Sequence, residues 1–363
     1  MAQIYNFSAG PAVLPVSVVH QVQSELVSYK NSGMSIMEIS HRSSLYTDME
    51  AEAEENLRKL MRIPAEYDVL FLQGGGTLQF AMVPLNLAKG NNQVGYIDSG
   101  HWAQRAIEEA QLVPKIKTDV VASAASTNYT TLPEVPKLKK QYDYIHLTLN
   151  NTIEGTMYRK LPENLKHQLL VGDMSSNIMA QRYNVEDFGL IYAGAQKNIG
   201  PAGMTVVIVK HELLDDKLEL PAMLSYVKQA AKHSALNTPP VFAIYVAGLV
   251  FKWLLEQGGV EEMQKRNEKK AELLYNYLDS SSLFNAPVTK DARSLTNIPF
   301  VTGNAELDQR FIADAQESGL VNLKGHRSVG GMRASLYNAF PFEGVQKLIE
   351  FMERFEQSVG GNR

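Results

Sequence analysis

One lysine of this sequence stands in a setting that suits covalent chemistry. Lys197 lies in segment 194–203, which is otherwise rich in glycine, alanine and amide side chains. The segment separates two apolar runs, Leu190–Tyr192 and Met204–Val209, that are typical of buried strands. If the fold removes water from this amine, its pKa falls and it becomes a nucleophile for a carbonyl carbon. The competing interpretation is a solvated lysine on a surface loop, which is the commoner setting for lysine.

A carboxylate stands earlier in the chain at a comparable position. Asp173 follows the apolar run Leu169–Val171 after one glycine. In open α/β sheets, ligands bind beyond the carboxyl ends of parallel strands. A carboxylate there can pair with a pyridinium nitrogen and keep it protonated. Taken alone, Asp173 is slightly better explained as the cap of a following helix or turn.

A glycine-rich loop, Gln73–Thr77, follows another predicted strand and opens a predicted helix. Glycines allow the backbone to approach an anion, and the free N–H groups of a helix start point at it. A dinucleotide-binding loop is an alternative, because Asp98 ends the next strand where a ribose ligand would be expected. However, the third glycine of that motif would fall at Gln79. An ordinary tight turn also remains an alternative.

Together, these three features indicate a pyridoxal phosphate site, which needs a phosphate cradle, a partner for the ring nitrogen and a Schiff-base amine. Two further residues suit such a site. Trp102 could stack on the ring, and Thr152 could bind the ring hydroxyl. A core tryptophan and a plain turn explain these two positions equally well.

Two His-Arg pairs point to an anionic substrate. His41-Arg42 and His326-Arg327 lie far apart in the sequence, and Arg333 stands close to the second pair. Arginine binds carboxylates and phosphates through two parallel hydrogen bonds. The pairs therefore suit a dianionic phosphate and leave Arg333 for a carboxylate, although scattered surface charge is the simpler explanation of each pair alone.

The elements that must position these residues read as an α/β fold. Short apolar runs alternate with helical stretches, which predicts a mainly parallel sheet with helices on both faces. The expected strands of this sheet are Val69–Leu72, Val94–Ile97, Tyr144–Leu149, Leu169–Val171, Leu190–Tyr192 and Met204–Val209.

The helical periodicity is clear at several places. An apolar face from Val18 to Tyr29 predicts one helix that ends before Gly33, and Thr47 is the expected N-cap of the next helix, with Glu50 as its capping-box partner. Long helices are expected from Pro240 to about Gln257 and over Val260–Asp279.

The C-terminal part has a different character. Strands Leu295–Val301 and Met332–Tyr337 and helices Leu307–Ser318 and Gly344–Phe355 predict a smaller α+β domain. We place the large domain at residues 1–265 and the small domain at 266–363, with the N-terminal segment packing on the small domain.

Composition narrows the function classes. The 363 residues carry a formal net charge of -4 and no cysteine. The charge argues against a general nucleic-acid binder, and the missing cysteine excludes a thiolate nucleophile and a cysteine-based zinc site. No signal peptide is visible at the N-terminus, and the longest apolar run is too short for a membrane span. We therefore expect a cytoplasmic protein without metal, membrane or nucleic-acid partners.

Several motifs together resemble the phosphoserine aminotransferases along nearly the whole chain. These motifs are Asn6–Pro15, Ser40–Ser43, Gly74–Phe80, Asn150–Thr156, Ala195–Asn198, Asn237–Pro240 and Gly325–Arg327. The resemblance departs at Thr77, where some members carry a bulkier basic residue, and at Ala9, where a serine can occur.

The resemblance implies a pyridoxal-phosphate-dependent transferase of fold type I, with a seven-stranded sheet and a homodimer that shares its active sites. It implies transfer of the amino group of L-glutamate to 3-phosphohydroxypyruvate, giving O-phospho-L-serine, and a related 4-phosphooxy substrate of pyridoxine synthesis. The implied cofactor residues are Gly76, Thr77, Trp102, Thr152, Asp173, Gln196, Lys197 and, from the partner subunit, Asn237 and Thr238. The implied substrate residues are Arg333 for the carboxylate and His326, Arg327 and the partner's His41 and Arg42 for the phosphate.

Other function classes remain as alternatives to be tested. Another small-substrate aminotransferase would share the cofactor, but the His-Arg pairs favour a phosphorylated substrate. A desulfurase needs a reactive cysteine, which this chain does not have. A dinucleotide oxidoreductase is disfavoured by Gln79, and a non-catalytic binding protein that keeps the fold is a third class. A yellow colour of the purified protein that borohydride bleaches would separate the pyridoxal phosphate enzymes from both.

Overall fold

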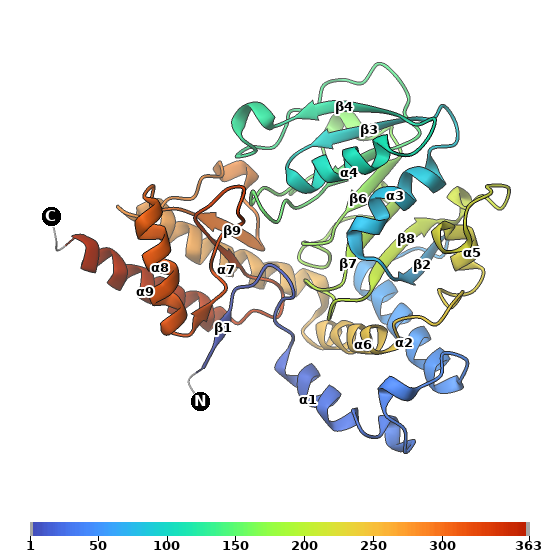
Figure 1. Cartoon of the computed structure of the whole chain (residues 1–363), viewed down its shortest axis with the longest axis horizontal. Helices are drawn as coiled ribbons and strands as arrows, with labels where there is room; N and C mark the ends of the chain where they lie inside the picture. Colours follow the sequence, from blue (N-terminus) through green and yellow to red (C-terminus); the bar gives the residue numbers. More distant parts are fainter. Residues whose placement is uncertain (1–2, 361–363) are drawn as a thin grey trace.

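The computed structural model describes residues 3–360 and contains a large sheet with helices on both faces, followed by a smaller C-terminal unit (Figure 1). The large sheet has seven strands in the order β2-β8-β7-β6-β5-β3-β4. The strands are β2 (Tyr67–Leu72), β3 (Gln93–Asp98), β4 (Lys117–Ser123), β5 (Ile145–Thr148), β6 (Leu170–Asp173), β7 (Leu190–Gly194) and β8 (Thr205–Lys210). Only β8 runs against its neighbours, β2 and β7. The prediction of a mainly parallel seven-stranded sheet is confirmed.

Alternate residues of every strand except the edge strand β4 face two separate apolar cores, which is why these strands are continuous apolar runs in the sequence. In β2, Val69 and Phe71 join one core, whereas Leu70 and Leu72 join the other. The first core is closed mainly by α2 (Ser44–Met61) and α6 (Val241–Glu256), and the second by α3 (Gly75–Leu87) and α4 (His101–Gln111). The sheet is therefore buried on both faces and forms a rigid base for whatever lies at its carboxyl edge.

Two helix boundaries differ from the predictions. The first helix, α1 (Val16–Glu25), ends four residues before Tyr29, which lies instead in a separate 3-10 turn and packs edge-on against Tyr245 at 5.5 Å. The N-cap of α2 is Ser43, whose hydroxyl accepts a hydrogen bond from the Tyr46 N–H; Thr47 lies inside the helix. The serine comes first in the chain and starts the helix, so the capping box predicted at Thr47 was wrong.

The C-terminal unit has its own apolar core. Strands β9 (Asn297–Phe300) and β11 (Met332–Ser335) pair antiparallel, and helices α8 (Ala305–Glu317) and α9 (Phe342–Gly360) cover them. The N-terminal strand β1 (Tyr5–Asn6) pairs with β10 (Leu320–Val321), and Tyr5 and Phe7 enter this same core. The exact domain limits, 1–265 and 266–363, stay a prediction.

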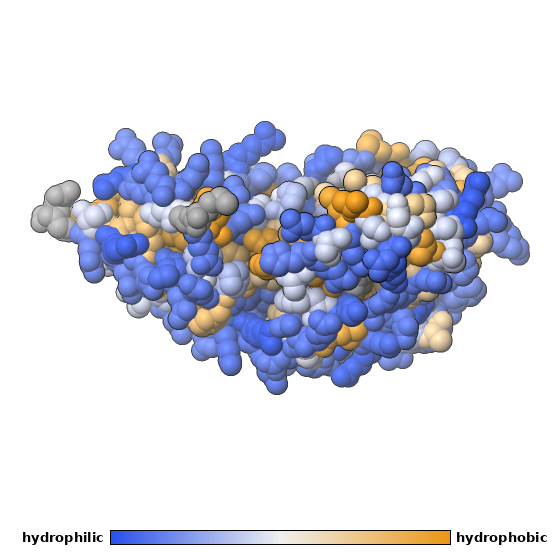
Figure 2. Space-filling view, turned by 90° about the horizontal axis from the view of Figure 1, so that it is seen from below, coloured by the Kyte–Doolittle hydropathy of each residue, from blue (hydrophilic) through white to orange (hydrophobic). Residues whose placement is uncertain are grey.

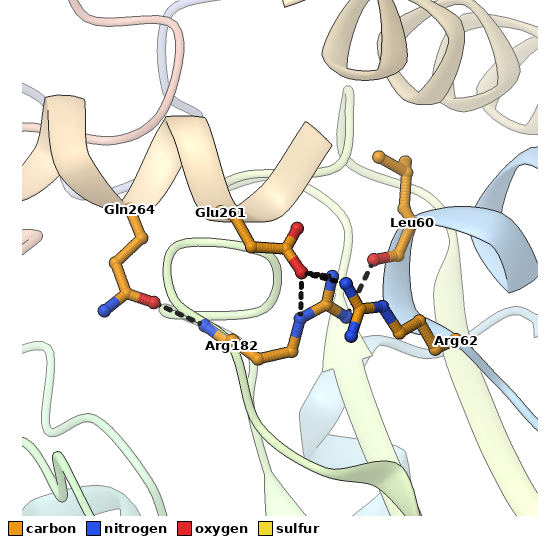
Figure 3. A network of polar contacts seen from close by, with 5 residues as sticks. All are labelled: Leu60, Arg62, Arg182, Glu261 and Gln264. Atoms are coloured by element: carbon orange, nitrogen blue, oxygen red, sulfur yellow. Dashed lines mark hydrogen bonds and ion pairs between the residues drawn. The ribbon is translucent and has the colours of Figure 1, made fainter. Parts of the chain in front are cut away.

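A long helix, α7 (Gly259–Ser280), links the two parts, and a polar network fixes its beginning (Figure 3). One oxygen of Glu261 accepts hydrogen bonds from Arg62 at 2.6 Å and from Arg182 at 2.7 Å. The Arg182 backbone N–H donates to Gln264 Oε1, and its guanidinium donates to the Leu60 carbonyl. The network therefore joins the end of α2, the loop after β6 and the first turns of α7.

The short helix α5 (Tyr226–Ala230) precedes α6 in a region that the sequence left without a clear assignment. Within residues 3–360, no single helix has both the length and the apolar character of a membrane span; α6 and α7 reach them only together, and the two are bent by 82°.

Candidate active site

A cavity of about 250 Å³ opens at the carboxyl edge of the sheet. Its walls come from the ends of β5, β6 and β7, the first turns of α3 and α4, the N-terminal segment and the C-terminal unit. Nine of the predicted site residues line it: Gly76, Thr77, Trp102, Thr152, Asp173, Gln196, Lys197, His326 and Arg333.

Lys197 occupies the turn between β7 and β8. The Ile199 N–H donates to the Ala195 carbonyl, and the Ala12 N–H donates to the Gln196 carbonyl at 2.9 Å, which holds the turn in place. The Lys197 amine donates to Thr152 Oγ1 at 3.0 Å. Burial lowers the pKa of this amine from 10.5 to about 8, with Arg333 lowering it further and Asp173 opposing the shift. A usable fraction of the amine is therefore neutral near pH 7.

Asp173 ends β6 and is 5% exposed. One of its oxygens accepts the Ser175 N–H at 2.9 Å. The nearby ring of His146 hydrogen-bonds the Tyr192 hydroxyl at 2.9 Å, and burial lowers the pKa of His146 to about 4, so this ring is neutral at pH 7. Asp173 therefore places a buried acidic side chain where it can pair with a cation in the cavity, such as a protonated ring nitrogen.

The glycine-rich loop Gln73–Thr77 places the N-terminus of α3 at the same cavity. Gly74 has φ +95°, and a Cβ there would meet a Leu78 side-chain carbon at 2.4 Å, so the turn requires glycine. Helix α3 begins at Gly75, and a Cβ on Gly76 would lie 3.2 Å from Ser175 Oγ. The first N–H groups of a helix have no partner within the helix and favour an anion.

Opposite this loop, side chains from three other elements close the cavity. Trp102 lies in the first turn of α4, and Arg333 on β11 donates to the Thr152 carbonyl at 3.0 Å. Burial lowers the pKa of Arg333. His326 also lines the cavity, its pKa lowered by burial and by nearby cationic groups. This wall therefore offers positive charge to an anionic ligand.

Five predicted residues do not line the cavity of the single chain. They are His41, Arg42, Asn237, Thr238 and Arg327. All five are exposed except His41, which is half-buried. Four of these five are the residues expected from a partner subunit, and their roles stay predictions.

Several lining residues were not singled out as site residues from the sequence. Ser175 and Ser176 lie two and three residues after Asp173, and Asn150 begins a motif already noted, so these three carried a signal by position. Gly10 belongs to the motif Asn6–Pro15 and carried the same kind of signal, whereas Thr148 carried none, because its place in the wall depends on strand register.

The donor set fits pyridoxal phosphate. The cavity offers an amine for the aldehyde, a buried carboxylate for the ring nitrogen and a helix start for the phosphate. Two buried polar atoms on its walls, Trp102 Nε1 and Thr148 Oγ1, have no hydrogen-bond partner among the described residues. Unpaired buried polar atoms are uncommon in folded proteins and are consistent with a ligand-binding wall.

Comparisons with known proteins give the same result. The model of the family "Aminotransferase class-V" matches residues 4–348. A phosphoserine aminotransferase from Listeria monocytogenes serotype 4b (strain F2365) is 55% identical over 361 residues, which is 99% of each chain. The solved phosphoserine aminotransferase from Bacillus circulans subsp. alkalophilus is 44% identical, with a TM-score of 0.95 over 98% of this chain and 99% of that chain.

A second solved structure, a phosphoserine aminotransferase from Trichomonas vaginalis with bound pyridoxal phosphate, is 35% identical, with a TM-score of 0.91 over 97% of this chain and all of that chain. The cavity and these similarities agree on an enzyme that uses pyridoxal phosphate. The chain therefore belongs to the phosphoserine aminotransferases, within the class-V aminotransferase family.

Proposed function

We propose that this enzyme transfers the amino group of L-glutamate to 3-phosphohydroxypyruvate, giving 2-oxoglutarate and O-phospho-L-serine. The observation that carries the proposal is the cavity itself, in which a buried amine of lowered pKa and a buried carboxylate face a helix start and a cationic wall. We propose the 4-phosphooxy keto acid that precedes 4-phosphooxy-L-threonine as a second substrate. These reactions belong to serine and pyridoxine biosynthesis, for which a cytoplasmic location is expected.

In this proposal, each cofactor residue has a distinct task. Asp173 pairs with the ring nitrogen, Trp102 packs on the ring face and Thr152 binds the ring hydroxyl. The helix start at Gly76 and Thr77 binds the phosphate together with Gln196 and the partner subunit's Asn237 and Thr238. When bound, pyridoxal phosphate supplies a carbonyl carbon and an electron-withdrawing ring that makes the substrate Cα–H acidic.

Lys197 carries the proton transfer. Its amine takes the proton from the substrate Cα and later returns one to the keto-acid carbon in the opposite half of the reaction. An amine suits both tasks when its pKa lies near the working pH, and burial brings the Lys197 pKa to about 8. The hydrogen bond to Thr152 Oγ1 keeps the nitrogen inside the cavity when it is not bonded to carbon.

The cationic wall selects the substrate. Arg333 binds the carboxylate that both substrates share, and His326 and Arg327 bind the phosphate together with the partner's His41 and Arg42. A phosphate monoester carries about -1.5 to -2 charges at pH 7, so it needs more than one cationic partner.

A homodimer would complete this set. Residues 16–37 expose a group of apolar side chains that a monomer would leave in water, namely Val16 at 70%, Val19 at 47%, Val27 at 80%, Met34 at 43% and Met37 at 65%. Figure 2 views the molecule from the side on which α1 lies in Figure 1 and shows apolar surface among hydrophilic residues. Exposed apolar groups of this kind favour an interface.

An activity assay tests the substrate assignment. Purified enzyme should aminate 3-phosphohydroxypyruvate with glutamate at a kcat/KM at least ~100-fold above that for hydroxypyruvate, which lacks the phosphate and its charge-assisted hydrogen bonds. Lys197→Ala should remain folded and lose turnover. Equal kcat/KM values for the two keto acids would refute the phosphate assignment.

Mixing two inactive variants tests the shared site. Lys197→Ala removes the amine of its own site, and Arg42→Ala removes a phosphate ligand from the neighbouring site. In a mixed dimer, one of the two sites has both residues intact. Activity at low phosphorylated substrate should therefore return when the two variants are unfolded and refolded together. If mixing restores nothing although mixed dimers form, Arg42 does not act across an interface.

A further inference from the structure

Glu154 is a buried carboxylate that the proposed mechanism does not use. It lies two residues after Thr152, in the loop that follows β5, and is 9% exposed. Burial raises the pKa of Glu154, whereas the His101 N–H and the Arg333 guanidinium lower it and Asp98 raises it. Burying a carboxylate is costly unless it is paired, so its position requires an explanation.

One oxygen of Glu154 holds the start of α4. Its Oε1 accepts the backbone N–H of His101, the first residue of that helix, at 2.9 Å. The neighbouring Ser99 hydroxyl donates to Asn151 Oδ1, so the loop and the helix start are joined twice. A carboxylate at a helix start is also favoured by the helix dipole. These contacts fix the turn that carries Trp102 into the cavity.

The other oxygen of Glu154 serves no hydrogen bond among the described residues. Oε2 is buried without a donor, and a Cβ added to Gly100 would lie 2.6 Å from it. An amide could provide the acceptor that His101 needs, so the helix contact alone does not require a charge. The charged group that gains from a carboxylate here is Arg333, whose guanidinium donates to the carbonyl of Thr152, two residues before Glu154, at 3.0 Å. At this place each of the two groups lowers the energy of the charged form of the other.

We propose that Glu154 is a positioning residue with two separable roles. Its hydrogen bond to the His101 N–H fixes the start of α4 and thereby the position of Trp102. Its negative charge weakens the binding of the substrate carboxylate by Arg333. The inference rests on the proposed functions of Trp102 and Arg333. A moderated Arg333 releases the product carboxylate more readily, because both substrate and product carry this group.

Two variants separate the roles. Glu154→Gln keeps the length and the acceptor but removes the charge, so the KM for L-glutamate should fall roughly two- to fivefold, as expected for one partly buried charge. Glu154→Asp keeps the charge but is too short to reach the His101 N–H, so Trp102 should loosen while the KM changes little.

The position of Trp102 can be read without measuring activity. The chain has two tryptophans, and in a Trp253→Phe background Trp102 is the only one left. Its fluorescence in the holoenzyme should be strongly quenched by the bound cofactor that it packs against. Glu154→Gln should keep this quenching, and Glu154→Asp should lose at least half of it.

The control is Glu163→Gln, which removes an exposed carboxylate farther along the same connection. It should change neither the KM nor the quenching. A KM for glutamate that rises in Glu154→Gln would show a merely structural role and overturn the charge effect. Unchanged quenching in Glu154→Asp would overturn the helix contact. Absence of quenching in the Trp253→Phe enzyme itself would refute the proposed place of Trp102, and with it the positioning of Trp102 by Glu154.

Discussion

Replacing Lys197 with methionine is expected to stabilise the cofactor-free protein at pH 7 while abolishing catalysis. In the unfolded chain, a lysine amine has a pKa near 10.5, and burial lowers the Lys197 pKa to about 8. The difference of 2.5 pKa units corresponds to roughly 3 kcal/mol against the charged form at about 1.4 kcal/mol per unit. Methionine fills a similar volume without a charge and avoids this cost.

The sign of the pH dependence follows from the same two values. Because folding lowers the pKa of this lysine, the cost to the stability of the fold has its full size below pH 8, where the folded state must hold the buried charge. Between pH 8 and 10.5 the unfolded chain binds more protons than the folded one, so stability rises with pH. The advantage of Lys197→Met should therefore be about 3 kcal/mol at pH 7 and should shrink towards zero by about pH 10.5.

Urea unfolding of cofactor-free protein at fixed concentration, measured at several pH values between 7 and 10, tests this expectation. Lys269→Met is the matched control, because Lys269 is an exposed lysine on α7. Effects of pH on all other groups are common to the variants and cancel in the difference. An advantage that is absent at pH 7, or that stays constant with pH, would refute the claim that burial sets the reactivity of this amine.

Three further changes have clear expectations. Asp173→Asn should lower the Lys197 pKa further, because the opposite charge that raises it is lost. The pH dependence of reductive methylation of the cofactor-free protein measures this change. Gly155→Ala should lower the free energy of unfolding by about 3 kcal/mol, because φ is +80° and the new Cβ would lie 2.2 Å from a proline ring. Gly303→Ala, at φ +76° but in open space, should lower it by only about 1 kcal/mol. Thermal unfolding of the two variants compares these losses. Glu261→Gln should cost about 1 kcal/mol, and less at high salt, because this carboxylate with its two arginine partners is 46% exposed (Figure 3).

The sheet could be predicted from the sequence where its strands are buried on both faces. Such strands are continuous apolar runs, and six of the seven were identified. The edge strand β4 was missed, because its Lys117-Thr118-Asp119 start faces solvent and only one side of the strand pairs. Its residues are exposed or half-buried throughout, so no apolar run marks them.

Helix ends were harder to predict than helix faces. The apolar spacing from Val18 to Tyr29 suggested one helix, but the chain turns after Glu25 and Tyr29 packs on α6 from a separate turn. Apolar spacing records which side chains are buried, and a turn can bury the same residues. In the same way, either Ser43 or Thr47 could cap α2, and the choice depends on where the preceding segment reaches the helix.

The candidate site was predictable because parallel strands place their carboxyl ends at one edge. Asp173 and Lys197 are separated by a whole crossover, and each alone had an ordinary explanation. Because both residues follow parallel strands of one sheet, they must lie at the same edge of the sheet, where the carboxyl ends of the strands meet. The hydrogen bond between Glu154 and the start of α4 could not be predicted, since it depends on how closely a loop approaches a helix at Gly100.

Charge explains why a single chain leaves the cavity incomplete for its proposed substrate. A phosphorylated keto acid brings a phosphate of -1.5 to -2 and a carboxylate of -1 at pH 7. Against these charges, the cavity wall of one chain places Arg333 and His326. The pKa of His326 is lowered, so its imidazole carries little positive charge at pH 7. Arg327 and Arg42 are both exposed outside the cavity. Tight binding of the phosphate therefore requires cations beyond the cavity of one chain. In the proposed homodimer, the exposed apolar face at residues 16–37 would form part of the interface, and Arg42, which follows this face in the chain, would supply such a cation to the neighbouring site.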